Sequence, residues 1–441
     1  MNARFAVTRL ALMSFVFVSA GSATAEEPAS DSAPTRRSTS PLNEQGLIPV
    51  DDAIESYKKR LARTPENASL RRLLGQLYLR KAKEQGDHHA YQLADQTFRQ
   101  VLEDNADDLA AQTFLATALQ AQHQFSKALE ISSRVAKRAP KNTLALATIG
   151  DCQLELGQYA EAEQSFKKLA EMTSGPAVQA RLARLAELKG HTDQAVELLT
   201  EALRDVQDAG GLPSLESWFE WRLGQLAFDA GRLQRAKRHF RNAIAVDSSN
   251  AQAAVGLAKI HGVQEEYGEA VAMFFAAVED FGEPPMMAAL GDIYARLGDI
   301  EEATRWYEQA EAAMAEEAVH AAAAHYREVA MFYADRDMKP KRALELAQKD
   351  FALRQDIYGH DMLAWVLYRN GRFAEAVESI ERAMQLGTRD AQIHFHAGLI
   401  YAAVGKTDLA RKSLETANEI NPHFSLLHSE TLKTQLDQFQ K

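Results

Sequence analysis

The residues of this 441-residue chain that could do chemistry are thirteen histidines, several paired carboxylates and one cysteine. None of the close histidine sets has the i, i+4 spacing beside a carboxylate that is typical of a zinc site on one helix. The first set is expected in a loop. The sequence therefore predicts no metal and no cofactor. The sets are His88 with His89, His320 with His325, and His394 with His396.

The paired carboxylates fall near expected helix starts or on polar faces, where negative charge complements the helix dipole. They are Glu265-Glu266, Glu301-Glu302 and Glu316-Glu317. The chain contains no HExxH, GxSxG, GxxxxGK[ST] or GxGxxG motif. Cys152 lies in an apolar stretch, which favours burial as a small hydrophobe over a reactive thiol or a bond between chains. We therefore expect a protein that is not an enzyme.

The N-terminus has the pattern of an export signal. Arg4 and Arg9 precede or open an apolar run over 10–18, and Ala23-Thr24-Ala25 offers a small-x-small cleavage site. The run is shorter than the ~20 residues that a spanning helix needs. The sequence predicts a signal peptide over 1–25, cleaved after Ala25, and a periplasmic or secreted protein with no transmembrane segment in the mature chain. A retained N-terminal anchor is the alternative.

The rest of the composition describes a globular chain with an acidic surface. The Ser- and Pro-rich stretch 26–45 predicts a flexible linker. The hydrophobic content of 46% is sufficient for an extended core, and the formal net charge is −11. A chain this acidic does not attract phosphate backbones as a whole, so no nucleic-acid partner is expected.

Two series of small residues recur along the chain with one common period. Most spacings are 33 or 34 residues and a few are 39 to 41, and after the first interval the two series agree to within one residue. Small residues at fixed intervals indicate places where two helices approach closely. The first series is Gly75, Ala116, Gly150, Ala183, Gly224, Ala258, Gly291, Ala330, Ala364 and Gly398, and the second is Ala94, Ala128, Ala162, Ala195, Ala236, Ala270, Ala303, Ala343, Ala376 and Ala410.

This pattern resembles the tetratricopeptide repeat, a 34-residue helix-turn-helix unit. The matches include Leu74-Gly75 with Tyr78, and Leu290-Gly291 with Tyr294. Aromatic residues also stand four positions after the second-series alanine, as at Phe166, Phe240, Phe274 and Tyr307. The turns carry glycine where a helix end needs a left-handed residue, as in Leu156-Gly157-Gln158-Tyr159 and Val404-Gly405-Lys406-Thr407.

The resemblance implies an all-α fold, a right-handed superhelical solenoid of about ten stacked antiparallel helix pairs. It would cover 66–422, with capping helices at 46–65 and 423–441. Extra residues interrupt the period near 84–91 and near 205–217, the second being a candidate hinge. A third excess, near 311–325, contains neither Gly nor Pro and predicts lengthened helices.

In this family the first helix of each pair lines the concave groove. The resemblance therefore places two aromatic clusters there, in the fifth and ninth pairs, where they could anchor a partner segment. Packing against neighbouring helices is the alternative for both. The candidate partner-binding residues are Trp218, Trp221, Phe228, Tyr358, Trp365, Tyr368, Arg184, Lys259 and Arg327, and Asp151 and Asp292 are expected on the same surface.

The sequence thus favours an exported scaffold whose groove holds a segment of a partner protein and organises an envelope complex. A second hypothesis is a carbohydrate-associated protein of exopolysaccharide synthesis or export, with the aromatic clusters stacking on sugars. An enzyme is the third and least favoured hypothesis. The repeats leave no stretch of about 100 residues for a separate catalytic domain. The partner, the process and the oligomeric state are not specified by the sequence.

Overall fold

The computed structural model describes residues 48–439, and for 318–324 the backbone alone. This part of the chain is helical and contains no strand. The predicted signal peptide and linker lie outside the described residues. The first helices are α1 Val50–Arg63, α2 Ala68–Gln85, α3 His88–Asp104, α4 Leu109–Ala121, α5 Phe125–Arg138, α6 Thr143–Glu155, α7 Tyr159–Met172, α8 Pro176–Leu188, α9 Thr192–Asp208 and α10 Pro213–Asp229.

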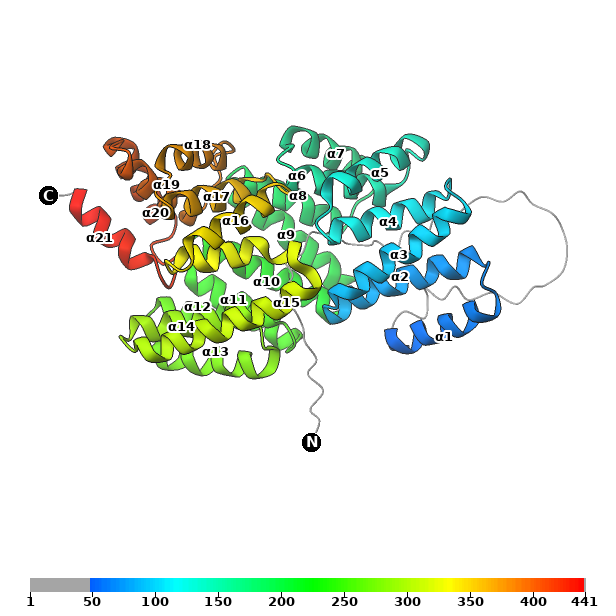
Figure 1. Cartoon of the computed structure of the whole chain (residues 1–441), viewed down its shortest axis with the longest axis horizontal. Coiled ribbons are helices and arrows are strands. Elements are labelled where there is room, and N and C mark those ends of the chain that lie inside the picture. The colour runs from blue at the N-terminus through cyan, green and yellow to red at the C-terminus, as the bar shows by residue number, and fades with distance from the viewer. Residues whose placement is uncertain (1–47, 440–441) are drawn as a thin grey trace.

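The remaining helices are α11 Leu233–Val246, α12 Ala251–Val263, α13 Tyr267–Phe281, α14 Pro284–Arg296, α15 Ile300–Asp335, α16 Pro340–Phe351, α17 Ile357–Arg369, α18 Phe373–Ala383, α19 Ala391–Ala403, α20 Thr407–Ile420 and α21 Ser429–Phe439. Each helix packs mainly on the next along the chain, so antiparallel pairs stack into a solenoid (Figure 1). The predicted all-α solenoid of helix pairs is confirmed.

Local sequence explains where the helices begin and end. Asn67, Asn142 and Asn250 accept hydrogen bonds from backbone N–H groups three residues later and so cap the first helix of their pairs. The turn inside a pair needs a residue at positive φ, which Gly157 (73°) and Gly405 (76°) supply as predicted. Asn and Gly therefore mark the two kinds of connection in the solenoid.

The small residues of the first series allow the two helices of a pair to touch. A Cβ atom added at Gly75 would lie 2.6 Å from the Phe98 ring, and one added at Gly224 would lie 2.6 Å from the Phe240 ring. Both rings are fully buried. Close packing leaves no room for a larger side chain at these positions, as the period predicts.

The period breaks are taken up mainly by longer helices. The extra residues near 205–217 lengthen α9 and α10, which are joined by a short connection. The extra residues near 311–325 lie within the single 36-residue helix α15. Near 84–91, His88 and His89 form the first turn of α3. The prediction that this histidine pair lies in a loop is therefore wrong, because Asp87 caps a helix that starts immediately after it.

The solenoid turns back and stacks on itself. We call α2–α14 the lower tier and α16–α20 the upper tier, with α15 joining them. Figure 1 shows α16–α20 alongside α6–α10, and hydrogen bonds fasten the tiers together. The Ile357 N–H donates to the Tyr159 hydroxyl, 198 residues away (2.6 Å), and the Gln355 N–H donates to the Glu155 carbonyl (2.9 Å). These bonds bring the connection before α17 against the turn between α6 and α7.

Candidate functional site

The inner wall of the lower tier carries a charged cluster where the upper tier meets it. On α8, the Glu187 carboxylate lies 3.0 Å from the Arg184 guanidinium and 2.8 Å from the Arg222 guanidinium of α10. Arg184 also lies over the ring of Tyr358, 5.0 Å from its centroid, which comes from the upper-tier helix α17. Burial raises the pKa of Glu187, but the two guanidinium groups outweigh it and hold that pKa below its usual value.

Three carboxyl groups where this wall meets the upper tier lack comparable cationic partners at contact distance. Burial and the neighbouring Asp390 carboxylate raise the pKa of Asp229 to about 7, and Gln225 donates the hydrogen bond that opposes this. Burial and Asp361 raise the pKa of Asp390 to about 6. Burial and Asp356 raise the pKa of Glu155. The wall therefore holds carboxylates that a basic ligand group would stabilise.

Trp218 and Trp221 form a half-buried aromatic pair on α10. Their ring centroids are 6.3 Å apart, and Trp218 stands edge-on to the buried Phe219 at 4.9 Å. Arg222 lies over the Trp221 ring at 5.5 Å. Because part of each indole is exposed, this pair can offer contact area to a ligand.

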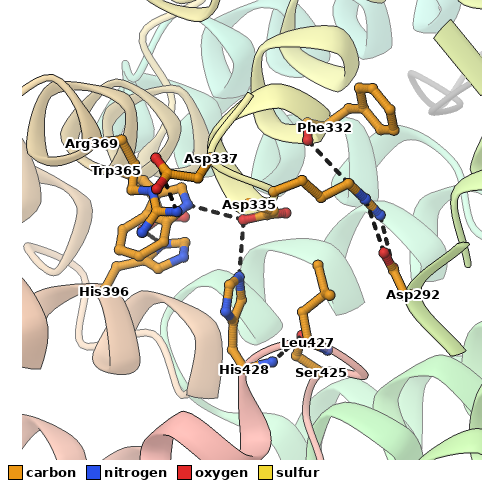
Figure 2. A network of polar contacts seen from close by, with 12 residues as sticks. Asp292, Phe332, Asp335, Asp337, Trp365, Arg369, His396, Ser425, Leu427 and His428 are labelled. Carbon is orange, nitrogen blue, oxygen red and sulfur yellow. Dashed lines mark hydrogen bonds and ion pairs between the residues drawn. The ribbon is translucent and has the colours of Figure 1, made fainter. Parts of the chain in front are cut away.

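Two of the predicted groove residues are core residues instead. Phe228 is 5% exposed and packs in the cluster around Phe240. Trp365 is 1% exposed, stacks on His396 at 4.2 Å and donates from Nε1 to Asp335 at 2.9 Å (Figure 2). Their assignment as partner-binding residues is corrected to packing, since neither side chain is accessible to a partner.

The other predicted groove residues are either partly or fully exposed, or held in ion pairs. Tyr368 stacks half-buried on Trp365, with 5.1 Å between the centroids. Arg327 on α15 is held by Asp350 at 3.1 Å and by Asp356 at 2.6 Å, so it ties α15 to α16 and to the start of α17. Lys259 on α12 is exposed.

Asp151 and Asp292 of the same predicted surface are largely buried. Asp151 pairs with Arg181 (2.8 Å), and Asp292 pairs with Arg336 (2.7 Å). Cys152 is fully buried, and burial raises the pKa of its thiol, which confirms the packing role.

Sequence reasoning missed Glu187, Arg222, Asp229 and Asp390. Glu187 stands three residues after Arg184, a spacing that pairs side chains on one helix face and could have revealed it. Asp390 and Tyr358 come from pairs five positions further along the solenoid. No local spacing reveals their approach, because it depends on the tiers stacking.

Within residues 48–439 no group of three or more His, Cys, Asp or Glu side chains is arranged to hold a metal ion. None of the helices described there is both long enough and apolar enough to cross a membrane.

Comparisons with known proteins agree on one family. Models of the tetratricopeptide repeat match 119–180, 153–210, 222–283, 284–313 and 362–423. Tetratricopeptide repeat protein 1 of Schizosaccharomyces pombe is 30% identical over 143 residues, which are 30% of this chain and 14% of that protein. The chain thus spans a small part of that relative.

Three solved structures resemble this chain at low sequence identity. Yeast Tom70 is 15% identical, with 85% of this chain and 96% of that chain covered and a TM-score of 0.33. A tetratricopeptide repeat protein from Parabacteroides merdae is 17% identical, with 60% and 99% covered and a TM-score of 0.34. The human IFIT1 dimer is 18% identical, with 76% and 77% covered and a TM-score of 0.49. On the matches of its repeats, this chain belongs to the tetratricopeptide repeat family.

Proposed function

We propose that this protein is a non-enzymatic scaffold that holds a segment of a partner protein against the inner wall of its lower tier. The repeat family supports a protein-interaction role. The observation that carries the proposal is the half-exposed pair Trp218 and Trp221, on the same helix as Asp229. An extended segment could place an apolar side chain on the indoles and a basic one beside that carboxyl group.

The charged cluster gives this wall specificity for charge. Glu187 is already matched by two guanidinium groups, whereas Asp229 and Asp390 repel one another. A Lys or Arg side chain of the partner would relieve that repulsion, and an acidic one would add to it. The preferred segment is therefore basic and carries at least one large apolar residue.

The place of action is also part of the proposal. The N-terminal pattern of Arg4, Arg9 and Ala23-Thr24-Ala25 supports export, so we propose that the scaffold works in the periplasm or outside the cell and organises an envelope complex. A fusion of residues 1–40 to a reporter that is active only after export tests this. An inactive reporter would contradict it.

Crosslinked affinity purification tests the binding wall. The intact protein should capture a specific partner from its native envelope, and the double variant Trp218→Ala with Trp221→Ala should lose it. Phe275→Ala is the matched control, because Phe275 is an exposed aromatic residue (40%) on α13. Equal capture by a folded double variant would contradict the proposal.

A carbohydrate ligand is the second candidate, since half-exposed indoles can also stack on sugar rings. Tryptophan fluorescence can distinguish a carbohydrate ligand from a peptide ligand. Trp306 and Trp365 are 4% and 1% exposed, so a ligand that changes tryptophan fluorescence acts through Trp218 and Trp221. Oligosaccharides that shift the emission, with basic peptides causing no change, would favour the carbohydrate function.

A further inference from the structure

The contact between the tiers joins two different edges of the solenoid. The turn edge consists of the turns inside each pair, and the loop edge consists of the connections between pairs. In the lower tier the turn edge is covered at three successive turns, α6–α7, α8–α9 and α10–α11. A Cβ added at Gly157, Gly190 or Gly231 would lie 2.6, 2.5 and 3.0 Å from a backbone oxygen of the upper-tier loop edge. Backbone packs directly on backbone along this line.

Hydrogen bonds follow the same line. The Asn421 side chain donates to the Phe228 carbonyl (2.7 Å), and the Thr388 hydroxyl donates to the Leu188 carbonyl. Both donors are buried, Asn421 at 0% exposure. The loop edge thus supplies donors, and the turn edge supplies the carbonyl groups at the ends of the first helices.

The turn edge of the upper tier has the same form but is uncovered. Gly371 and Gly405 have φ values of 72° and 76°, close to the 73° of Gly157, yet nothing lies within 4 Å of a Cβ added at either. Phe373 is 38% exposed, whereas Tyr159 at the same position of its pair is 7% exposed. Val404 is also exposed along this edge.

The loop edge of the lower tier is also uncovered. Asn105 ends α3 as Asn421 ends α20, with a similar extended backbone, but Asn105 is exposed. Leu212, in the connection before α10, is 69% exposed. Each molecule therefore has one free turn edge and one free loop edge, the two kinds of surface that already pack together between its own tiers.

We propose that a second copy of this chain docks head to tail, with the loop edge of its lower tier on the turn edge of the first copy's upper tier. This contact continues the existing inter-tier interface. Because the two surfaces differ, every added copy leaves one free edge of each kind, so the contact is head to tail rather than a symmetric dimer.

Sedimentation velocity over a concentration series tests the proposal. The sedimentation coefficient of the full chain should rise with concentration. Phe373→Glu with Val404→Glu should abolish that rise, because charged side chains would be buried between copies. Phe275→Glu is the control, since it places the same charge on α13, away from both edges, and should leave the rise unchanged. A chain that remains monomeric throughout, or a rise that survives the double variant, would overturn the proposal.

Thiol crosslinking gives an independent readout of polarity. Cys152 is the chain's only cysteine and is buried, so introduced thiols react alone. Chains with Asn105→Cys mixed with chains carrying Val404→Cys should crosslink, and chains with Asn105→Cys alone should not. Preferential crosslinking of like positions would indicate a symmetric contact and overturn the head-to-tail arrangement.

Discussion

Trp218 with Trp221 and Trp365 with Tyr368 are aromatic clusters on the first helices of the fifth and ninth pairs, yet their surroundings differ. The first cluster is half-exposed on the inner wall, whereas Trp365 is 1% exposed. The cause is the segment after Asn421. His428 stands edge-on to Trp365 at 5.7 Å and pairs with Asp335 at 3.2 Å (Figure 2).

The comparison shows that repeat position alone does not decide whether an inner aromatic residue is groove or core. In the upper tier, the C-terminal segment covers the inner wall. Leu432 of α21 is 1% exposed and belongs to the same cluster as Trp365. In the lower tier no described segment covers Trp218 and Trp221 to that extent. The proposed binding wall lies where the solenoid leaves its inner face open.

The largest expected effect is on stability. Trp365→Ala should lower the free energy of unfolding by about 3–5 kcal/mol, since it leaves a cavity and removes a donor from Asp335. Trp218→Ala should cost under about 2 kcal/mol, because its ring is only half-buried. Urea denaturation of both variants measures the difference. Equal losses would mean that the two clusters are packed alike.

Detaching α21 should make Trp365 as accessible to solvent as Trp218 and Trp221. Leu432→Asp places a charge in the core and should detach the helix, so Trp365 should become accessible to acrylamide quenching. Lys433→Asp, at an exposed neighbouring position, is the control and should leave quenching unchanged. Unchanged quenching in the Leu432 variant would show that α21 does not shield Trp365.

The contact between the tiers should depend on Asn421 more than on its lower-tier counterpart. Asn421→Ala should cost about 0.5–1.5 kcal/mol, because the Phe228 carbonyl loses the Asn421 donor and keeps only the Gly231 N–H. Asn105→Ala should change stability by less than about 0.5 kcal/mol in the monomer, since this side chain is exposed. Thermal denaturation at low protein concentration compares them, and equal losses would contradict the stacking of the tiers described above.

The most gradual expected effect is on pH dependence. Burial and Asp390 raise the pKa of Asp229 to about 7, so the folded chain binds more protons than the unfolded chain between about pH 4 and about pH 7. The free energy of unfolding should therefore fall as pH rises through this range. Between about pH 6 and about pH 8, Asp229 should contribute a loss of about 1.4 kcal/mol.

Asp229→Asn should remove that part of the slope, with Glu197→Gln on the exposed face of α9 as the control. Denaturation curves at several pH values measure both variants. An unchanged slope in Asp229→Asn would show that this carboxyl group is not the source.

Repeat spacing in the sequence predicts the helix pairs, their turns and the all-α class, because each pair is a local unit with its own small residues and caps. The resemblance to the tetratricopeptide repeat also places Trp218, Trp221 and Arg184 on first helices, where the structure has them. The burial of Trp365 does not follow, since it requires a segment some 60 residues later to fold back. The meeting of Tyr358 with Arg184 likewise depends on how the tiers stack.

Hydroxyl-radical footprinting with and without the captured partner is the most direct measurement of the open wall. In the free protein Trp218 and Trp221 should be oxidised readily and Trp365 hardly at all, and the partner should protect the first two without changing the third. Oxidation of Trp365 as fast as Trp218, or a bound partner that leaves Trp218 and Trp221 equally reactive, would contradict the assignment of the lower-tier inner wall as the binding surface.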